Sequence, residues 1–181
     1  MNNLYLIGLP GSGKTTLGRQ LATHYGREFV DLDASIVAEA GQNIPAIFAT
    51  EGEAGFRQRE AAALTRVAGR PEPLVVATGG GTPCFHDNLQ LLQRTGFVLW
   101  LAVPVPELAR RLAAAGQAAA RPLLAATTTP TAAENPEIAL NEHLTRTLAA
   151  RQQFYAHAHL QHPGGPLAEV VVALAAAGFH P

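Results

Sequence analysis

A glycine-rich segment near the start of the chain carries the residue types of a phosphate-binding site. Residues 8–15 read GLPGSGKT and satisfy the pattern G-x-x-x-x-G-K-[ST]. Glycine lets successive backbone N–H groups point into one concavity, and the N-terminus of a following helix attracts the anion. Lys14 can reach the β- and γ-phosphates of a nucleotide, and the Thr15 hydroxyl can bind Mg²⁺. The segment predicts a nucleoside triphosphate site, and its other expected contributors are Gly11, Ser12, Gly13 and Thr16.

A dinucleotide-binding fingerprint is a competing interpretation of the same segment. The GSG of residues 11–13 matches part of it, and the DLD of residues 31–33 follows at about the distance of a ribose-binding acid. Thr16 stands near the place of the third glycine, and the Lys-Thr pair has no function in that fingerprint. The triphosphate interpretation is therefore favoured, ahead of a plain strand-to-helix turn.

The acid that commonly helps to hold Mg²⁺ at the end of an interior strand is missing here. The apolar run before Thr78 leads into glycines instead. Asp31 and Asp33 are two residues apart, so on extended backbone they would point to the same side. We expect one to face the metal and the other to position or deprotonate an acceptor hydroxyl. Alternatively, Asp33 caps a helix that begins at residue 34.

A glycine trio stands where ligands usually bind to a parallel sheet. Gly79, Gly80 and Gly81 follow a buried apolar run, at the carboxyl end of the predicted strand. The absence of side chains would let a substrate lie directly on backbone N–H groups. The alternative is an ordinary loop, for which one glycine normally suffices.

Three arginines are candidates for contacts with phosphate or acceptor. Arg57 has Glu53 and Glu60 at helical spacing, so a solvated series of ion pairs would also explain it. Arg121 lies in a loop of small residues and could close over a transferring phosphate. Arg151 stands on the helix expected after that loop. Taken singly, each arginine is more often solvated than functional.

Alternating strands and helices are expected to position these residues. Apolar runs predict strands over 4–7, 28–33, 73–81, 97–103 and 157–160. Helical patterns cover 14–25, 34–40, 51–68, 106–115, 136–156 and 166–177. The small, proline-punctuated stretch 116–136 is expected to be a mobile loop. This order predicts a parallel sheet covered by helices on both faces.

The composition is typical of a globular protein with one domain over residues 1–181. Hydrophobic residues make up 48%, charged residues 15%, and the net charge is −1, which gives no indication of a nucleic-acid partner. No apolar run approaches the ~20 residues that span a bilayer, so no membrane partner is expected. Cys84 is the single cysteine, which excludes an internal disulfide and fits a cytoplasmic location.

The motifs taken together resemble those of the shikimate kinases. GLPGSGKTT, DLD, FRQRE, TGGGT, RPLL and RQQFY occur in that family's order, and the resemblance extends from Leu4 to Tyr155. It implies a three-layer α/β/α fold of the P-loop kinase type, with a five-stranded parallel sheet and a mobile lid at about 113–136. It also implies transfer of the ATP γ-phosphoryl group to the 3-hydroxyl of shikimate, by a protein expected to be a monomer.

The resemblance also implies a role for each motif on the ATP side. Thr15 would bind Mg²⁺ with support from Asp31, while Lys14 and Arg121 would contact the phosphates. The stretch before Arg121 is rich in alanine, where the family commonly has an arginine and polar residues against the adenine. The segment after Leu124 is longer than usual, which affects the expected lid rather than the chemistry.

On the acceptor side, the resemblance implies that Asp33 contacts the shikimate hydroxyls and orients or deprotonates the attacking one. Arg57 and Arg151 would hold the carboxylate, and the backbone of residues 79–81 would flank the ring. Two alternatives stay open. One is another small-molecule kinase, for gluconate or a nucleotide, and the other is a nucleotide-binding regulatory protein without catalysis.

Overall fold

The fold is built on a sheet of five parallel strands, in the order β2-β3-β1-β4-β5. The computed structural model describes residues 3–114 and 136–181. The strands are β1 (Asn3–Ile7), β2 (Glu28–Asp31), β3 (Leu74–Ala77), β4 (Gly96–Leu101) and β5 (Leu160–His162). β1 occupies the centre, where Leu6 is in register with Ala77 of β3 and Leu99 of β4. The parallel sheet predicted from the sequence is confirmed.

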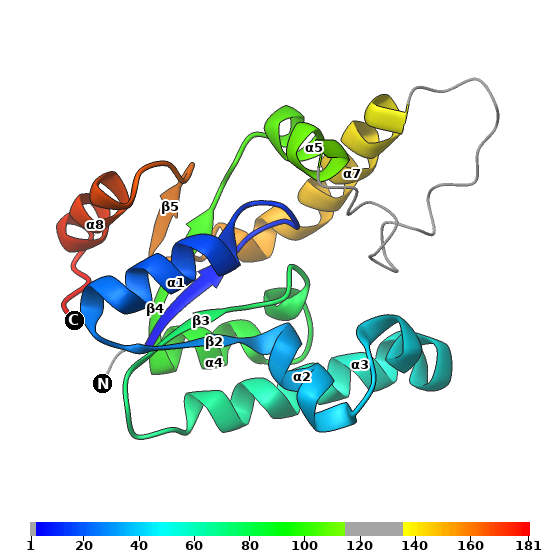
Figure 1. Cartoon of the computed structure of the whole chain (residues 1–181), viewed down its shortest axis with the longest axis horizontal. Coiled ribbons are helices and arrows are strands. Elements are labelled where there is room, and N and C mark those ends of the chain that lie inside the picture. Colours follow the sequence, from blue (N-terminus) through cyan, green and yellow to red (C-terminus); the bar gives the residue numbers. More distant parts are fainter. Residues whose placement is uncertain (1–2, 115–135) are drawn as a thin grey trace.

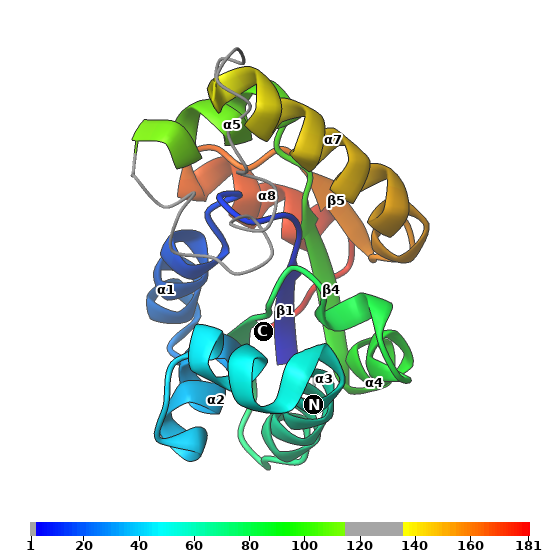
Figure 2. The same ribbon diagram turned by 90° about the vertical axis from the view of Figure 1, so that its right-hand side faces the viewer.

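Helices cover both faces of this sheet, as the sequence predicts (Figure 1). They are α1 (Lys14–Tyr25), α2 (Leu32–Ala40), α3 (Ile44–Ala68), α4 (Asn88–Thr95), α5 (Val105–Ala114), α7 (Pro136–Tyr155) and α8 (Leu167–Ala176), with a short 3₁₀ helix η1 (Thr82–Cys84). Seen from the side in Figure 2, α5 and α7 lie on one side of the strand ends and α2 and α3 on the other. The site described below lies between these two pairs.

Two apolar cores hold the layers together, one on each face of the sheet. The core on the α1 face joins Leu4 and Leu6 of β1 to Leu21 of α1 and Leu174 of α8. The other core contains Ile7 of β1 and side chains from α2, α3, α4, α5 and α7. Alternate residues of β1 thus face opposite cores, because successive side chains of a strand point to opposite faces. Within the described residues, the helices are too short or too polar to cross a membrane.

Several boundaries differ from the prediction. β2 ends at Asp31, two residues before the predicted end, because helix α2 begins at Leu32. α3 begins at Ile44, where the Asn43 side chain accepts a hydrogen bond from Ala46 N at 2.9 Å. Its backbone is broken at Gly52, near the predicted start of the helix.

The sequence prediction also missed short elements beyond the glycine trio. Residues 82–84 form η1, residues 88–95 form α4, and β5 lies at 160–162 rather than 157–160. β3 ends at Ala77, four residues before the predicted end, so the glycine trio lies outside the strand, and the remaining ends fall within two residues of the expected ones. Short segments carry too few residues for a periodic pattern to be distinguished from a loop.

A buried asparagine fixes the start of the central strand to its surroundings. Asn3 is the first residue of β1, a strand that is buried along its whole length. Asn3 Oδ1 accepts a hydrogen bond from Leu74 N at 2.8 Å, and Nδ2 donates to the Tyr5 hydroxyl at 2.9 Å. The Tyr5 hydroxyl in turn lies 2.8 Å from Thr95 Oγ1, so one network joins β1, β3 and α4.

We predict that Asn3→Ala lowers the free energy of unfolding by about 1–3 kcal/mol, because it leaves the Leu74 N–H buried without an acceptor. Urea unfolding followed by circular dichroism measures the loss, with an unchanged m-value expected. Gln90→Ala, at an exposed position of α4, is the control and should have little effect. Equal stabilities for the two variants would show that the Asn3 network contributes nothing.

Candidate active site

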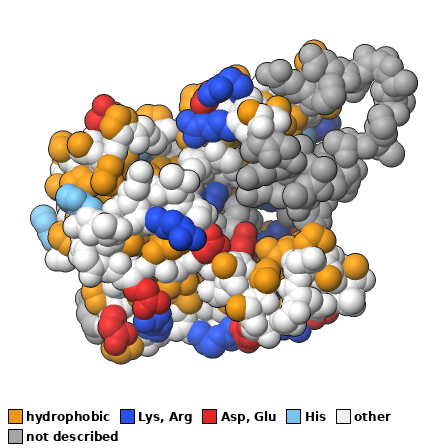
Figure 3. All heavy atoms as spheres, in the orientation of Figure 1, with side chains coloured by type: hydrophobic (Ala, Val, Ile, Leu, Met, Phe, Trp, Pro, Cys, Tyr) orange, Lys and Arg blue, Asp and Glu red, His pale blue; other side chains and the backbone are white. Residues whose placement is uncertain are grey.

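A pocket of about 430 Å³ opens at the carboxyl ends of β1 and β3. The connection after β1 leads to α1 on one face, whereas the connection after β3 leads to α4 on the other. Such a divergence leaves a crevice at the strand ends, where ligands bind in parallel α/β sheets. Acidic side chains gather beside the hollow in this face of the molecule (Figure 3). Its lining residues are Gly11, Gly13, Lys14, Thr15, Thr16, Asp31, Asp33, Thr78, Gly79, Gly80, Arg111 and Leu112.

The glycine loop between β1 and α1 forms one wall of the pocket. Gly8 and Gly13 have φ values of 139° and 90°, which side-chain-bearing residues rarely adopt. The Lys14 ammonium lies inside the loop, donating to Gly8 O at 3.0 Å and Leu9 O at 2.9 Å. Ser12 Oγ is 3.4 Å from the same nitrogen. The loop therefore encloses a positive charge at the N-terminus of α1, where an anion is stabilised.

Thr15 and Asp31 meet at the edge of this loop. The Thr15 hydroxyl donates to Asp31 Oδ2 at 2.9 Å, although the residues belong to α1 and to the end of β2. A hydroxyl and a carboxylate are the hard oxygen donors that Mg²⁺ prefers. The pair therefore fits a magnesium ion, while β3 leads only into Thr78, whose hydroxyl donates to Leu6 O at 3.1 Å.

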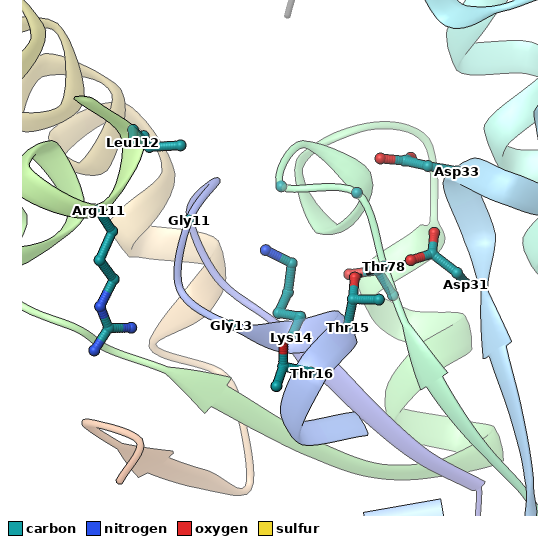
Figure 4. A pocket seen from close by; sticks show the side chains of 12 residues that line it. Gly11, Gly13, Lys14, Thr15, Thr16, Asp31, Asp33, Thr78, Arg111 and Leu112 are labelled. Atoms are coloured by element: carbon teal, nitrogen blue, oxygen red, sulfur yellow. Dashed lines mark hydrogen bonds between the residues drawn. The ribbon is translucent and has the colours of Figure 1, made fainter. Parts of the chain in front are cut away.

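The expected arrangement of the two acids on one extended strand is wrong. Asp31 is the N-cap of α2, and its Oδ1 accepts a hydrogen bond from Ala34 N at 3.2 Å. Asp33 lies in the first turn of the helix rather than on extended backbone, so it is not the cap either. Both carboxylates still line the pocket (Figure 4), but Asp33 is placed there by the first turn of α2 and not by an extended strand.

Charged side chains surround the glycine trio from three elements. A Cβ atom built on Gly79 would lie 2.9 Å from Asp33 Oδ1 and 2.8 Å from Glu60 Oε1. One built on Gly80 would lie 3.1 Å from Arg151 Nη1, and one on Gly81 would lie 2.7 Å from both terminal nitrogens of Arg57. The side chains of Asp33, Arg57 and Arg151 thus all approach the backbone of residues 79–81, which carries no side chains itself.

Arg57 is buried, so its interpretation as a solvated member of a helical ion-pair series is wrong. Only 4% of the residue is exposed, and its Nη1 lies 2.8 Å from Glu60 Oε2, whose side chain is also buried. Glu53, at the surface, accepts from Arg57 Nη2 at 3.1 Å. The predicted pairs exist, but they hold the guanidinium against Gly81 instead of in water.

Glu60 also fixes the start of the loop after the trio. Its second oxygen, Oε1, accepts a hydrogen bond from Thr82 Oγ1 at 2.6 Å. From the sequence alone, Glu60 is expected only as a surface partner of Arg57. Its position in FRQRE, three residues after the arginine, carried no sign of burial, because burial depends on η1 packing against α3.

Tyr155 anchors the trio from the other side. Its hydroxyl donates to the Gly80 carbonyl oxygen, and its ring is fully buried beside Trp100. Burial raises the pKa of Tyr155 to about 12, partly offset by the charge of Arg151. The phenol therefore stays protonated and acts as a donor. In the sequence, Tyr155 is distinguished only as the last residue of the RQQFY motif.

The pocket has a further wall that was not anticipated. Arg111 and Leu112 of α5 lie across the pocket from Asp31 and Asp33, with Lys14 between the two sides (Figure 4). Arg111 Nε lies 2.7 Å from Glu107 Oε1. Arg121 and most of the expected lid at 113–136 lie outside the described residues.

Comparison with known proteins assigns this arrangement to a family. The family model described as "Shikimate kinase" matches residues 10–166, which is most of the chain. The chain belongs to the shikimate kinase family. A shikimate kinase of Synechococcus elongatus is 53% identical over 110 residues, which cover 61% of this chain and 57% of that protein. The chain thus matches little more than half the length of this curated relative.

Solved structures of shikimate kinases share the architecture over nearly the whole chain. The enzyme of Acinetobacter baumannii, solved in complex with shikimate, is 34% identical with a TM-score of 0.82, covering 99% of this chain and 96% of that one. The enzyme of Bacteroides thetaiotaomicron is 36% identical with a TM-score of 0.77, covering 88% and 85%. The P-loop kinase fold expected from the sequence is confirmed.

We predict that Glu60→Ala lowers the free energy of unfolding by about 3 kcal/mol, because it removes the buried partner of Arg57. Glu51→Ala is the matched control: its carboxylate pairs with Arg59 at the surface, at 2.8 Å, and water replaces that contact. Chemical unfolding of both variants measures the difference. Equal free energies of unfolding for Glu60→Ala and Glu51→Ala would contradict a stabilising role for the buried pair.

Proposed function

We propose that this protein catalyses the ATP- and Mg²⁺-dependent phosphorylation of the 3-hydroxyl of shikimate. The observation that carries the proposal is the convergence of Asp33, Arg57 and Arg151 on the Gly79–Gly81 backbone, beside a complete phosphate-binding loop. A phosphate-binding loop alone supports many reactions. The second cluster of charges supplies the features that select an acceptor.

The charges at the glycine trio match the chemistry of shikimate. Its carboxylate suits a pair of arginines, whose planar guanidinium groups bind carboxylates with directed hydrogen bonds. Its hydroxyls suit the Asp33 carboxylate, which lies over Gly79 at the opposite end of the trio from Arg57. The molecule would therefore lie along the trio, with its acid end at Gly81 and its hydroxyl end toward the phosphate-binding loop.

The phosphate-binding loop supplies the ATP side of the reaction. Gly11, Ser12, Gly13 and Thr16 would surround the phosphates through backbone and hydroxyl groups, and Lys14 would neutralise the transferring group. Thr15 and Asp31 would hold Mg²⁺, which would supply positive charge to offset that of the phosphates. We further propose that Arg121 contacts the phosphates when the lid covers them.

Asp33 is proposed to position the attacking hydroxyl and accept its proton. Both acids line the pocket, and Asp31 is held beside the phosphate-binding loop by Thr15 and by the N-terminus of α2. Asp33 lines the same pocket as the phosphate-binding loop and lies against Gly79 of the trio, so its carboxylate can face donor and acceptor at once. A base at this position would accept the proton of the hydroxyl while the hydroxyl oxygen forms its bond to phosphorus.

An ADP-release assay with shikimate, gluconate and nucleoside monophosphates tests the proposal against its alternatives. Shikimate-dependent turnover in the presence of Mg²⁺ is expected, and chelation of the metal should abolish it. Turnover with gluconate or a nucleotide alone would identify a different small-molecule kinase. ATP binding without turnover would identify a regulatory protein.

Three broader properties belong to the same proposal. We propose one kinase domain over residues 1–181 with its lid at about 113–136, a monomeric state, and a cytoplasmic location. The single cysteine of the chain supports the last of these. Gel filtration with light scattering measures the molecular mass.

We predict that Asp33→Asn lowers kcat by about 100-fold or more, because the amide no longer accepts the proton of the attacking hydroxyl. KM for ATP should change little, since the phosphate-binding loop is intact. Asp87→Asn is the control, because Asp87 is exposed at the start of α4. A near-normal kcat for Asp33→Asn would show that another group acts as the base.

A further inference from the structure

An aromatic ring covers the guanidinium group of Arg57. The Arg57 Cζ atom lies over the Phe85 ring, 4.0 Å from its centroid. Phe85 is half-buried and follows directly after η1, whereas the neighbouring Phe56 ring is farther from the same atom, at 5.2 Å. A cation this close to the face of a ring is attracted by its negative electrostatic potential, and more strongly where water is excluded.

The remaining contacts of Arg57 fix the edges of the guanidinium group rather than its plane. Glu53 accepts from Nε at 3.3 Å and from Nη2 at 3.1 Å, and Glu60 accepts from Nη1 at 2.8 Å. Gly81 lies against both terminal nitrogens. The carboxylates contact the edges of the group and leave its flat faces uncovered, and the Phe85 ring covers one of these faces.

The backbone around Phe85 is held by contacts that determine where the ring lies. Cys84 N donates to Gly81 O at 2.9 Å, and the Asn88 side chain donates to Thr82 O at 3.0 Å. His86, the next residue after Phe85, has a φ of 51°, in the left-handed region that residues other than glycine rarely adopt. A conformation of this kind persists only where surrounding contacts hold it, and functional sites are where it is often found.

We propose that Phe85 is a positioning residue for substrate binding: it sets the plane of the Arg57 guanidinium so that the group meets the substrate carboxylate in a paired, in-plane geometry. This inference rests on the proposed function, in which Arg57 binds the carboxylate of shikimate. Two parallel N–H···O bonds require coplanar partners, so a tilted guanidinium loses part of the interaction. Phe85 touches the arginine rather than the reacting atoms, so its effect should fall on binding and not on phosphoryl transfer.

The first test replaces the ring by groups of similar size. Phe85→Leu keeps apolar packing but removes the π-face, and it should raise KM for shikimate roughly 2- to 30-fold with kcat and KM for ATP nearly unchanged. Phe85→Tyr keeps the π-face and should restore a KM near that of the unaltered protein. Equal KM values for the Leu variant and the unaltered protein would overturn the proposal.

A graded series separates the electrostatic contact from simple packing. Phe85 is replaced by mono-, di- and trifluorophenylalanine, which weaken the negative potential of the ring with little change in shape. The logarithm of KM for shikimate should rise steadily with fluorine number. A flat series would show that the ring acts only as a packing group.

The matched control is Phe97→Leu, because Phe97 is also half-buried but stacks on His159, on the face of the sheet that carries α8. Its KM for shikimate should be unchanged.

A shikimate analogue with a primary alcohol in place of the carboxylate provides a second control, since its KM should not respond to Phe85→Leu. An equal response with this analogue would overturn the proposal. Absence of shikimate turnover in the unaltered protein would instead refute the proposed function, so the two failures are distinguishable.

Discussion

The bare backbone of residues 79–81 is the constraint on which the site depends. A Cβ atom there would displace a charged group: Asp33 and Glu60 at Gly79, Arg57 at Gly81 and, by a smaller shift, Arg151 at Gly80. The trio follows β3, a neighbour of the strand that leads into the phosphate-binding loop. The topology thus puts the proposed acceptor surface beside the phosphate-binding loop, and the missing side chains would leave room there for a small, polar molecule.

Electrostatics explains why this surface keeps its shape. Arg57 is a buried cation, which is costly unless partners replace the lost water. Glu60 supplies one partner and simultaneously binds Thr82, so the ion pair and the loop after the trio are ordered together. Tyr155 binds the Gly80 carbonyl from α7, the helix that also carries Arg151. A contact thus fixes the backbone near each arginine: Glu60 holds Thr82 near Arg57, and Tyr155 holds Gly80 near Arg151.

The sequence predicts the parts of this arrangement that depend on local patterns. The phosphate-binding loop has a fixed spacing, and the three central strands, β1, β3 and β4, are nearly continuous apolar runs, so both could be identified. The position of Asp33 could not, because two residues of a strand and the first turn of a helix look alike over three letters, DLD. The burial of Arg57 depends on η1, a three-residue element without a periodic pattern. The roles of Glu60 and Tyr155 arise from contacts between distant segments, for which one sequence carries no local signal.

A phosphate donor and a carboxylate-bearing acceptor are proposed to meet at the carboxyl ends of β1 and β3. A crystal structure with shikimate and a non-hydrolysable ATP analogue tests it most directly. We expect the shikimate carboxylate on Arg57 and Arg151, its ring along residues 79–81, and its 3-hydroxyl between Asp33 and the γ-phosphate. Shikimate bound away from the glycine trio, or with its carboxylate facing Asp33, would contradict the account.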